Sequence, residues 1–340
     1  MNTADGAPPQ IPAPVQMMQL LAGFQVSQAL YVAAKLDLAT ILGNGPQTID
    51  QLAAETNADA DALGRIIRFL ATLGVFRTNG DQVEITELGA TLADDRPGSI
   101  RYAALYWMET HYAPFGDLLH TASTGETAAT RYYGQPFFDW ISTDAEKLEV
   151  QNRTFANVTS SLRAGMFEGY RLPEGAVVAD LGGADGSMLT KLLAGDADRQ
   201  GIVFDRPEVV VAAQKTLADN GLADRVQTVG GDFFESVPAA DVYILSYILH
   251  DWDDESCRRI LRNVAEAAEP GARVVLVESV IPPGDEPHPG KVVDLTMLAM
   301  GSGRERTAEE YRALLDSAGF TLDRIVPSPT PFAFVEATLR

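Results

Sequence analysis

The sequence predicts an α/β protein in which a doubly wound parallel sheet follows a smaller helical, winged-helix-like domain. The chain has 340 residues, a length that suggests about two domains. Beyond residue 176, short apolar runs that end in a polar residue alternate with helical stretches, which is the rhythm of a parallel sheet. Before residue 86, two amphipathic helices precede a β-hairpin. The predicted parts are a disordered leader at 1–14, a winged-helix-like domain at 15–100, a helical segment at 101–170 and an α/β domain at 171–340.

The N-terminal part opens with the leader, which contains four prolines and is expected to be disordered. From Gln16 to Leu42, apolar residues recur at helical spacing and cover much of the circumference, which predicts one long helix. A helix that is apolar on most sides must be buried. At the edge of a small domain the natural burial partner is a second copy of the chain, so this segment predicts a homodimer.

The winged-helix-like region follows. Thr48 is a helix cap, a second helix is predicted at 60–73, and an Asn79-Gly80 turn joins the two strands of a wing. Residues 48–92 carry seven acidic residues against three arginines, a net charge of −4, and the whole chain carries −21. Because DNA phosphates repel such a surface, we expect no nucleic-acid partner and a role in dimerisation. A non-enzymatic winged-helix ligand sensor remains an alternative.

Composition points to a cytoplasmic location. Cys257 is the single cysteine, which excludes internal disulfides and fits a reducing compartment. The first residues have neither the basic nor the apolar part of a signal peptide. No run of 18 apolar residues occurs, so we expect no membrane span.

The helical segment at 101–170 is rich in aromatic residues. Aromatic residues at helical spacing are usually core, and most of these are expected to be so. Their density just before the α/β domain is also what a lid over a flat aromatic substrate requires. Trp107 and Phe155 are the candidates in this segment for contact with such a substrate.

The stretch from Val177 to Ser187 predicts a buried strand, a tight loop and a helix. The loop follows the pattern D-x-G-G-x-x-G, and its glycines let the backbone approach a ligand closely. A dinucleotide fingerprint would need a glycine at Leu181, so a nicotinamide oxidoreductase is disfavoured. A glycine turn with no ligand remains the structural alternative.

The predicted parallel strands all end in polar residues. Because the carboxyl ends of such strands meet at one edge, these side chains are expected to form one site. A carboxylate at Asp205 suits the two hydroxyls of a ribose, and Asp232 suits an adenine amine with Phe233 stacked on the ring. Alternatively, Asp205 is a turn or helix-capping residue before Pro207, and Asp232 belongs to a turn. The strand-end residues are Asp180, Asp205, Asp232, Ser246, His250 and Glu278.

His250 is the candidate general base, because histidine titrates near neutral pH and this one follows an apolar strand. Glu278 and Glu305 are placed to orient the imidazole and to balance its charge. The alternative is a strand-end histidine packed on Trp252. The acidic run at 251–255 fits a helix N-terminus, so we predict no metal site there.

These motifs together resemble the caffeate O-methyltransferase-like family, whose members are small-molecule methyltransferases that depend on S-adenosyl-L-methionine (SAM). The glycine loop is similar to motif I of class I SAM methyltransferases. The resemblance runs from about residue 15 to the end. The matching stretches are Asp180–Gly186, Phe204–Pro207, Gly231–Phe234, Ile248–Trp252, Val277–Glu278 and Arg304–Thr307.

The resemblance implies a class I methyltransferase fold with an N-terminal dimerisation domain, and methyl transfer to a hydroxyl of an aromatic secondary metabolite. It implies His250 as the base, flanked by Glu278 and Glu305. Some relatives carry out decarboxylation or hydroxylation instead, which is the alternative chemistry. Plant members have a SAM-contacting lysine where Ser246 stands, and a methionine where Phe155 stands. The SAM contacts that the resemblance implies are Gly182, Asp205, Asp232 and Phe233, and Asp180 and Ser246 are further candidate contacts at the strand ends. The expected substrate contacts are Trp107, Phe155, Asp251, Met297 and Met300.

Overall fold

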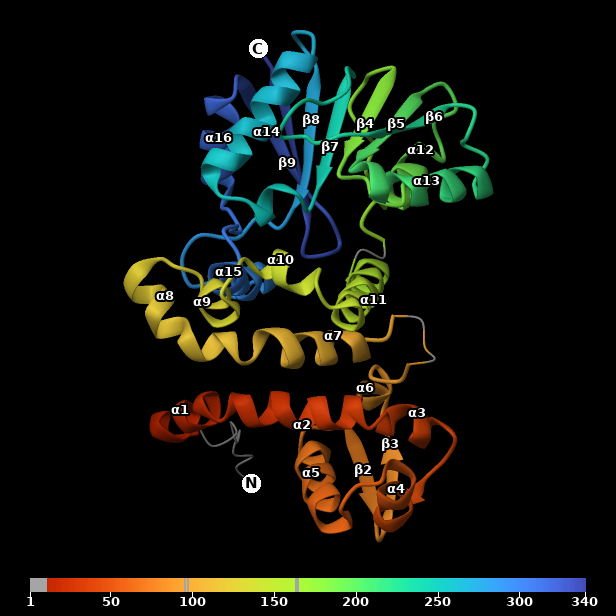
Figure 1. Cartoon of the computed structure of the whole chain (residues 1–340), viewed down its shortest axis with the longest axis vertical. Coiled ribbons are helices and arrows are strands. Elements are labelled where there is room, and N and C mark those ends of the chain that lie inside the picture. Colours follow the sequence, from red (N-terminus) through yellow and green to blue (C-terminus); the bar gives the residue numbers. More distant parts are fainter. Residues whose placement is uncertain (1–10, 95, 97, 163–164) are drawn as a thin grey trace, which may run out of the picture. The chain divides into compact units, whose positions relative to one another are not determined.

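The structure is a computed structural model that describes residues 11–94, 96, 98–162 and 165–340. The chain divides into two compact units (Figure 1). One comprises residues 1–113 and 141–161, and the other residues 114–140 and 162–340. The segment predicted at 101–170 is therefore shared between the two units. The first ten residues of the predicted leader lie outside the described residues, and helix α1 begins at Ala13.

The first unit opens with three helices, α1 (Ala13–Leu21), α2 (Gly23–Lys35) and α3 (Leu38–Gly43). The single helix predicted from Gln16 to Leu42 is therefore wrong. The backbone leaves the helix at Ala22 and again at Asp37, which takes the left-handed conformation with φ 55°. Aspartate tolerates this region because its short polar side chain can bond locally. Here the Asp37 carboxylate accepts a hydrogen bond from the Thr40 hydroxyl at 2.7 Å.

The predicted helices and wing of the first unit are present. Thr48 and Gln51 form a capping box at the start of α4 (Ile49–Thr56), and α5 spans Ala60–Thr72. Strands β2 (Phe76–Asn79) and β3 (Gln82–Ile85) form the hairpin, and β1 (Gln47–Thr48) pairs with β3. The unit is completed by α6 (Glu87–Ala90), α7 (Arg101–Tyr106), the π-helical turn η1 (Trp107–His111) and most of α11 (Ala145–Leu162).

The second unit is built on a seven-stranded sheet with the order β6-β5-β4-β7-β8-β10-β9. Strands β4 to β8 are parallel, and the C-terminal β9 and β10 form an antiparallel hairpin at one edge. The doubly wound sheet and its closing hairpin confirm the prediction. The strands are β4 (Val177–Leu181), β5 (Gln200–Asp205), β6 (Val226–Gly230), β7 (Val242–Ser246), β8 (Arg273–Glu278), β9 (Phe320–Pro327) and β10 (Ala333–Leu339).

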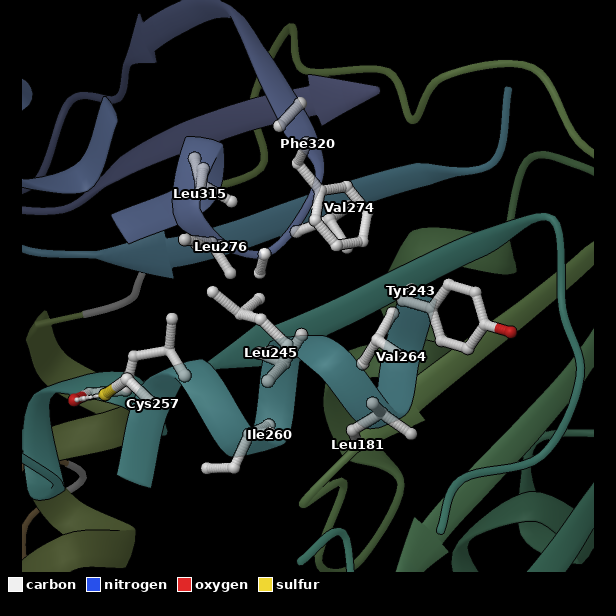
Figure 2. Close-up of a cluster of buried hydrophobic side chains, with 14 of the residues drawn as sticks. Leu181, Tyr243, Leu245, Cys257, Ile260, Val264, Val274, Leu276, Leu315 and Phe320 are labelled. Carbon is white, nitrogen blue, oxygen red and sulfur yellow. Dashed lines mark hydrogen bonds between the residues drawn. The ribbon is translucent and has the colours of Figure 1, made fainter. Parts of the chain in front are cut away.

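Both faces of this sheet are buried, because alternate side chains of each central strand enter different cores. On one face Leu181, Leu245 and Leu276 pack against α14 (Asp254–Ala267) and α16 (Ala308–Ser317) (Figure 2). On the other face Val178 and Ile244 belong to the core formed with α12 (Ser187–Leu193) and α13 (Pro207–Asp219). Such burial, at about 25 cal/mol per Å² of apolar surface, holds the strands rigid and fixes where their carboxyl ends lie.

Shorter helices complete the second unit. They are η2 (Pro114–Asp117), α8 (Leu118–Thr124), α9 (Ala128–Tyr133), α10 (Phe137–Ile141), η3 (Leu249–Asp251) and α15 (Pro289–Met300). In the part of the chain that the structure describes, no helix combines the length and the apolar character that crossing a membrane requires.

Candidate active site

The loop between β4 and α12 turns sharply on its glycines. Gly182 has φ 76°, a left-handed conformation that favours glycine, and a Cβ atom there would lie 2.4 Å from Ile248 Cδ1 and push that side chain aside. Ala184 also has a positive φ, 46°, and its N–H donates to the Asp205 carboxylate at 2.9 Å. The loop is thereby tied to the end of β5, and its backbone lies where a ligand can approach. Asp180, on β4, is fully buried beneath it.

The next two strand ends carry the residues predicted to hold a nucleoside. Asp205 ends β5, and its second oxygen accepts the Arg206 N–H at 2.7 Å. Asp232 is exposed and accepts the Phe234 N–H at 2.8 Å. The ring of Phe233 is half-buried and packs edge-on against that of Phe234, with centroids 5.0 Å apart. Asp205 does not cap helix α13, and it accepts from the glycine loop as well as from its neighbour Arg206. Asp232 makes the turn contact that was considered as its alternative, and both acids remain at the edge where the strands end.

Ser246 ends β7, and its hydroxyl oxygen is buried without a hydrogen-bond partner among the described residues. A buried polar atom of this kind is normally satisfied, and the missing partner suggests a polar ligand at this strand end.

His250 lies in the one-turn helix η3 that follows β7, and 4% of its surface is exposed. Its Nδ1 lies 3.0 Å from Glu305 Oε1, and its Nε2 lies 3.2 Å from Asp251 Oδ1. The Tyr247 ring covers one face of the imidazole, with centroids 3.7 Å apart. Because a carboxylate only accepts, both nitrogens carry a proton when the ring is charged. The shorter contact to the buried Glu305 favours the proton on Nδ1 in the neutral ring, which leaves Nε2 as the nitrogen that takes or releases one.

Glu278, at the end of β8, acts on the backbone before His250 rather than through a direct hydrogen bond to its ring. Its Oε1 accepts the N–H groups of Ile248 at 3.2 Å and Leu249 at 2.9 Å. The carboxyl group is fully buried, and burial raises its pKa to about 7. Glu278 thus fixes the strand-to-η3 turn from which the imidazole projects.

The three acids around His250 keep its imidazole charged. Burial opposes the charge, but Asp251, Glu305 and Glu278 outweigh it and raise the pKa of His250 to about 9. In the unliganded protein the ring is therefore mainly an imidazolium at neutral pH.

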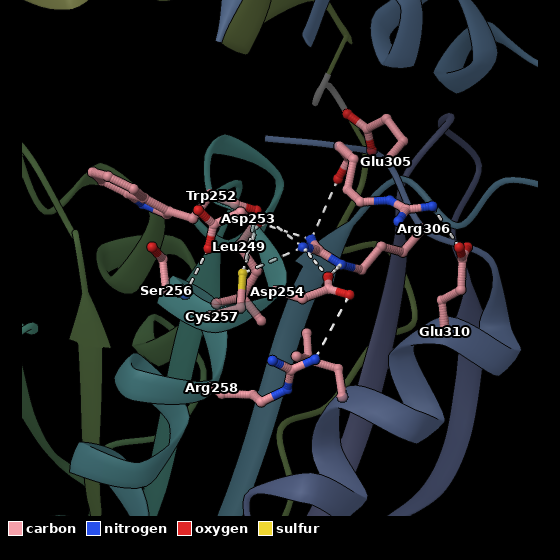
Figure 3. A network of polar contacts seen from close by, with 12 residues as sticks. Leu249, Trp252, Asp253, Asp254, Ser256, Cys257, Arg258, Glu305, Arg306 and Glu310 are labelled. Atoms are coloured by element: carbon pink, nitrogen blue, oxygen red, sulfur yellow. Dashed lines mark hydrogen bonds and ion pairs between the residues drawn. The ribbon is translucent and has the colours of Figure 1, made fainter. Parts of the chain in front are cut away.

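Three contributors to this arrangement were not predicted from the sequence. The Tyr247 ring lies tilted against the imidazole, and its backbone takes a left-handed conformation with φ 59°, which no pattern in the sequence predicted. Gly303 packs so closely that a Cβ atom there would lie 1.9 Å from the His250 carbonyl oxygen. Arg306 donates hydrogen bonds to the loop on both sides of His250 (Figure 3). Gly303 and Arg306 belong to the same Gly-Arg-Glu-Arg run as Glu305, which was the available signal.

The predicted substrate contacts fall in both units. Asp251 lies beside His250, and α15 carries Met297, half-buried, and Met300, buried. Trp107 and Phe155 belong to the first unit, where 52% and 49% of their surfaces are exposed. Phe155 packs edge-on against Tyr106. Within the described residues, no group of three or more His, Cys, Asp or Glu side chains is arranged to hold a metal ion.

Comparison with known proteins identifies the class. A family model described as an O-methyltransferase domain matches residues 115–321, and one described as an O-methyltransferase dimerisation domain matches residues 18–95. Together with the parallel sheet and its glycine loop, these matches show that the chain belongs to the O-methyltransferase family of class I methyltransferases.

Individual relatives cover nearly the whole chain. Phenazine O-methyltransferase PhzM from Lysobacter antibioticus is 40% identical over 329 residues, which is 96% of each protein. The crystal structure of LaPhzM matches with a TM-score of 0.87 and 39% identity, over 97% of this chain and 100% of that one. NcsB1 from neocarzinostatin biosynthesis, solved with SAM and 2-hydroxy-5-methyl naphthoic acid, matches with a TM-score of 0.81 and 31% identity, over 98% and 100% of the two chains.

The enzyme is accordingly a SAM-dependent O-methyltransferase, and its residues fit the cofactor. The left-handed backbone at Gly182 favours a residue without a side chain, and the Ser246 hydroxyl lacks a partner in the described part of the molecule. A differently named relative also matches: aclacinomycin 10-hydroxylase RdmB from Streptomyces purpurascens is 32% identical, over 94% of this chain and 88% of its own.

Proposed function

We propose that this enzyme transfers a methyl group from SAM to a hydroxyl of an aromatic secondary metabolite, with His250 as the general base. One observation carries the choice of base. The imidazole is buried where the parallel strands end, and Glu305 holds the Nδ1 proton, which leaves Nε2 to accept the hydroxyl proton. Aromatic acceptors are named for relatives such as the phenazine enzyme.

The cofactor would be held along the strand ends. Gly182 brings bare backbone to it, Asp205 offers its remaining lone pairs to the ribose hydroxyls, and Ser246 gains the partner it lacks. Asp232 and Phe233 would contact the adenine, and Asp180, buried at the end of β4, is the remaining candidate for a cofactor contact. When bound, SAM supplies a methyl group on a positively charged sulfur atom.

The residues around His250 would control the transfer of the acceptor's hydroxyl proton. Neutral Nε2 takes the hydroxyl proton while the acceptor oxygen forms its bond to the methyl carbon, and the electrons of the carbon–sulfur bond remain on sulfur as a neutral thioether. The ring then carries the positive charge, which Glu305 and Glu278 stabilise. Before each turnover the ring must lose a proton, because its pKa in the free enzyme is about 9.

The substrate would be recognised by the residues that the sequence analysis named as its contacts. Asp251 already touches Nε2 and would meet the acceptor hydroxyl there, while Met297 and Met300 form an adaptable apolar wall. Trp107 and Phe155, each about half exposed in the first unit, remain the aromatic candidates for a substrate contact. The single cysteine fits a cytoplasmic enzyme.

The test begins with calorimetric titration of the purified protein with SAM and with NAD. We expect micromolar binding of SAM and none of NAD. A panel of phenolic acceptors is then incubated with SAM and analysed by mass spectrometry. A product heavier by one methylene unit supports methyl transfer, whereas the gain of an oxygen atom or the loss of carbon dioxide would show that the enzyme shares the alternative chemistry.

We also propose a homodimer formed through the dimerisation domain. Helix α1 buries none of its residues within the chain, and large apolar side chains are exposed along α1 and the start of α2. Such a surface calls for a partner, and the dimerisation-domain match names a second copy. Light scattering of Leu20→Asp should show monomers where the unaltered protein shows dimers. The exposed residues are Met17, Met18, Leu20, Leu21 and Phe24.

A further inference from the structure

Arg306 is the only buried arginine in the described ranges, with 1% of its surface exposed. Its three guanidinium nitrogens all donate hydrogen bonds (Figure 3). Nη1 bonds the Leu249 carbonyl oxygen at 2.9 Å, and Nη2 bonds the Trp252 carbonyl oxygen at 2.9 Å. Nε and Nη2 both reach Asp254 Oδ1, at 3.1 and 2.8 Å. One planar group therefore joins the residue before His250 to the start of helix α14.

The same residue is fixed to the other two segments of the site. Its backbone pairs with Val280, and its carbonyl oxygen accepts the Ile281 N–H at 3.1 Å, just beyond Glu278 on β8. Its neighbour Glu305 contacts His250 Nδ1. The residues that carry His250, Glu278 and Glu305 thus belong to three chain segments that meet at Arg306.

A guanidinium group is suited to this junction. Burying a charge is costly unless it is paired and fully bonded, and Arg306 meets that condition with one carboxylate and several carbonyl oxygens. Lysine offers a point charge with three donors and lacks the planar fork that spans the Leu249 and Trp252 carbonyl groups. A lysine here would keep the charge and lose the simultaneous grip on both sides of His250.

We propose that Arg306 is a positioning residue that holds His250 against Glu305 and keeps Nε2 aimed at the acceptor hydroxyl. This inference rests on the proposed role of His250 as the base. Arg306 touches neither reacting atom in this arrangement. It acts through the Leu249 and Trp252 carbonyl groups, which set the path of η3.

The molecule contains a matched control. Arg225 also donates to three backbone carbonyl oxygens, those of Leu193, Asp196 and Arg199, at 2.7 to 3.0 Å. It precedes β6 and therefore lies at the amino ends of the parallel strands, opposite the edge where His250 lies. Arg225→Lys should lower thermal stability while leaving kcat unchanged.

The experiment compares Arg306→Lys, Arg306→Met and Arg225→Lys in the full-length enzyme. For Arg306→Met we expect kcat to fall about a hundredfold, the size of effect that a misplaced catalytic group gives, with SAM affinity within about threefold. Arg306→Lys should recover only part of the loss. It also serves where the methionine variant fails to fold.

A second readout follows His250 itself. The protein has four histidines, so His250 can be assigned in the NMR spectrum by comparison with His250→Gln. Arg306→Lys preserves the charge, and loss of the Glu305 contact should then lower the pKa of His250 from about 9. Arg225→Lys should leave this titration unchanged.

The proposal is overturned if Arg306→Lys keeps both the kcat and the His250 titration of the unaltered enzyme, or if Arg225→Lys loses kcat to the same extent. The His250→Gln variant distinguishes a failure of the proposed role of His250 from a failure of the proposed role of Arg306. If that variant keeps its kcat, the assignment of the base fails, and the titration in Arg306→Lys still decides whether Arg306 holds the ring.

Discussion

Two buried histidines in this molecule behave in opposite ways. His111 lies in the π-helical turn of the first unit with 8% of its surface exposed, and His250 lies at the strand ends of the second unit with 4% exposed. Burial lowers the pKa of His111 to about 4. Burial also acts on His250, but carboxylates outweigh it, and the pKa rises to about 9. Depth in the protein therefore does not decide the charge of a histidine.

The difference lies in whether charged partners oppose the effect of burial. His111 Nδ1 lies 2.7 Å from the Thr110 hydroxyl, which already donates its proton to the Tyr106 carbonyl oxygen at 2.5 Å. Nδ1 must then be the donor to Thr110, and a neutral ring satisfies that bond. His250 faces Glu305 and Asp251, which stabilise a second proton on the ring. Burial without a carboxylate beside the ring keeps His111 neutral, whereas the carboxylates beside His250 favour its charged form.

The largest contrast should appear in catalysis when each histidine becomes glutamine. His250→Gln should lower kcat by about 100- to 10,000-fold, the usual contribution of a general base. His111→Gln should leave kcat within about threefold, because His111 has no assigned role in the proton transfer. Steady-state methyl transfer with one acceptor measures both. Equal losses in the two variants would remove the basis for separating them.

The second contrast concerns the carboxylate on Nδ1. Glu305→Gln removes a charge that raises the pKa of His250, so the rise of kcat/KM with pH should move to lower pH. The limiting rate at high pH should fall about a hundredfold, because the ring loses its orienting acceptor and its imidazolium loses a counter-charge. The pH profile of the unaltered enzyme should rise toward pH 9. An unchanged midpoint in Glu305→Gln would mean that this carboxylate does not set the basicity of His250.

The contrast between the histidines also shows what the sequence could predict. The parallel sheet, the wing and the strand-end acids follow from local patterns, because alternation and glycine turns are written in consecutive residues. His250 was predicted as the base because it follows an apolar strand. The break at Asp37 was missed, because nothing in the apolar spacing marks a single left-handed residue.

The missed parts of the site are those that depend on long-range contacts. Arg306 lies 57 residues from Leu249 along the chain, and only the folded sheet brings its guanidinium group to that carbonyl. Glu278 was expected beside the imidazole, yet its hydrogen bonds go to the backbone N–H groups of Ile248 and Leu249. Strand ends indicate which residues meet, but side-chain geometry decides which atoms touch.

The two histidines should contribute to the free energy of unfolding over different ranges of pH. The ordinary pKa of histidine, near 6.5, applies to the unfolded chain. The folded pKa of His111 is depressed, so its stabilising contribution is present above pH 6.5 and is lost as pH falls toward 4. The folded pKa of His250 is raised, so its contribution is present below pH 6.5 and is lost as pH rises toward 9. Each contribution is on the order of 3 kcal/mol.

Urea unfolding at fixed protein concentration, from pH 4 to pH 9, measures these contributions as differences from the glutamine variants. The stability advantage over His111→Gln should shrink on the acid side, and that over His250→Gln on the alkaline side. Glu278 titrates in the same cluster as His250, with its pKa raised to about 7 by burial, so the alkaline difference belongs to that group of residues together. Parallel curves for the two variants would contradict the opposite signs.

The smallest expected effect tests why His111 stays neutral. Thr110→Val keeps the shape of the side chain and removes the oxygen that accepts from His111 Nδ1. A buried donor left without this acceptor should cost about 1–3 kcal/mol of unfolding free energy, with kcat unchanged. Thermal and urea unfolding at pH 7.5 measure the loss, and Thr72→Val, at an exposed helix end in the same unit, is the control.

Because the threonine carries no charge, the Thr110→Val variant should leave the titration of His250 unchanged, whereas loss of the Glu305 charge should shift it. Equal stability of Thr110→Val and the unaltered enzyme would show that burial alone, without the hydroxyl contact, keeps His111 neutral.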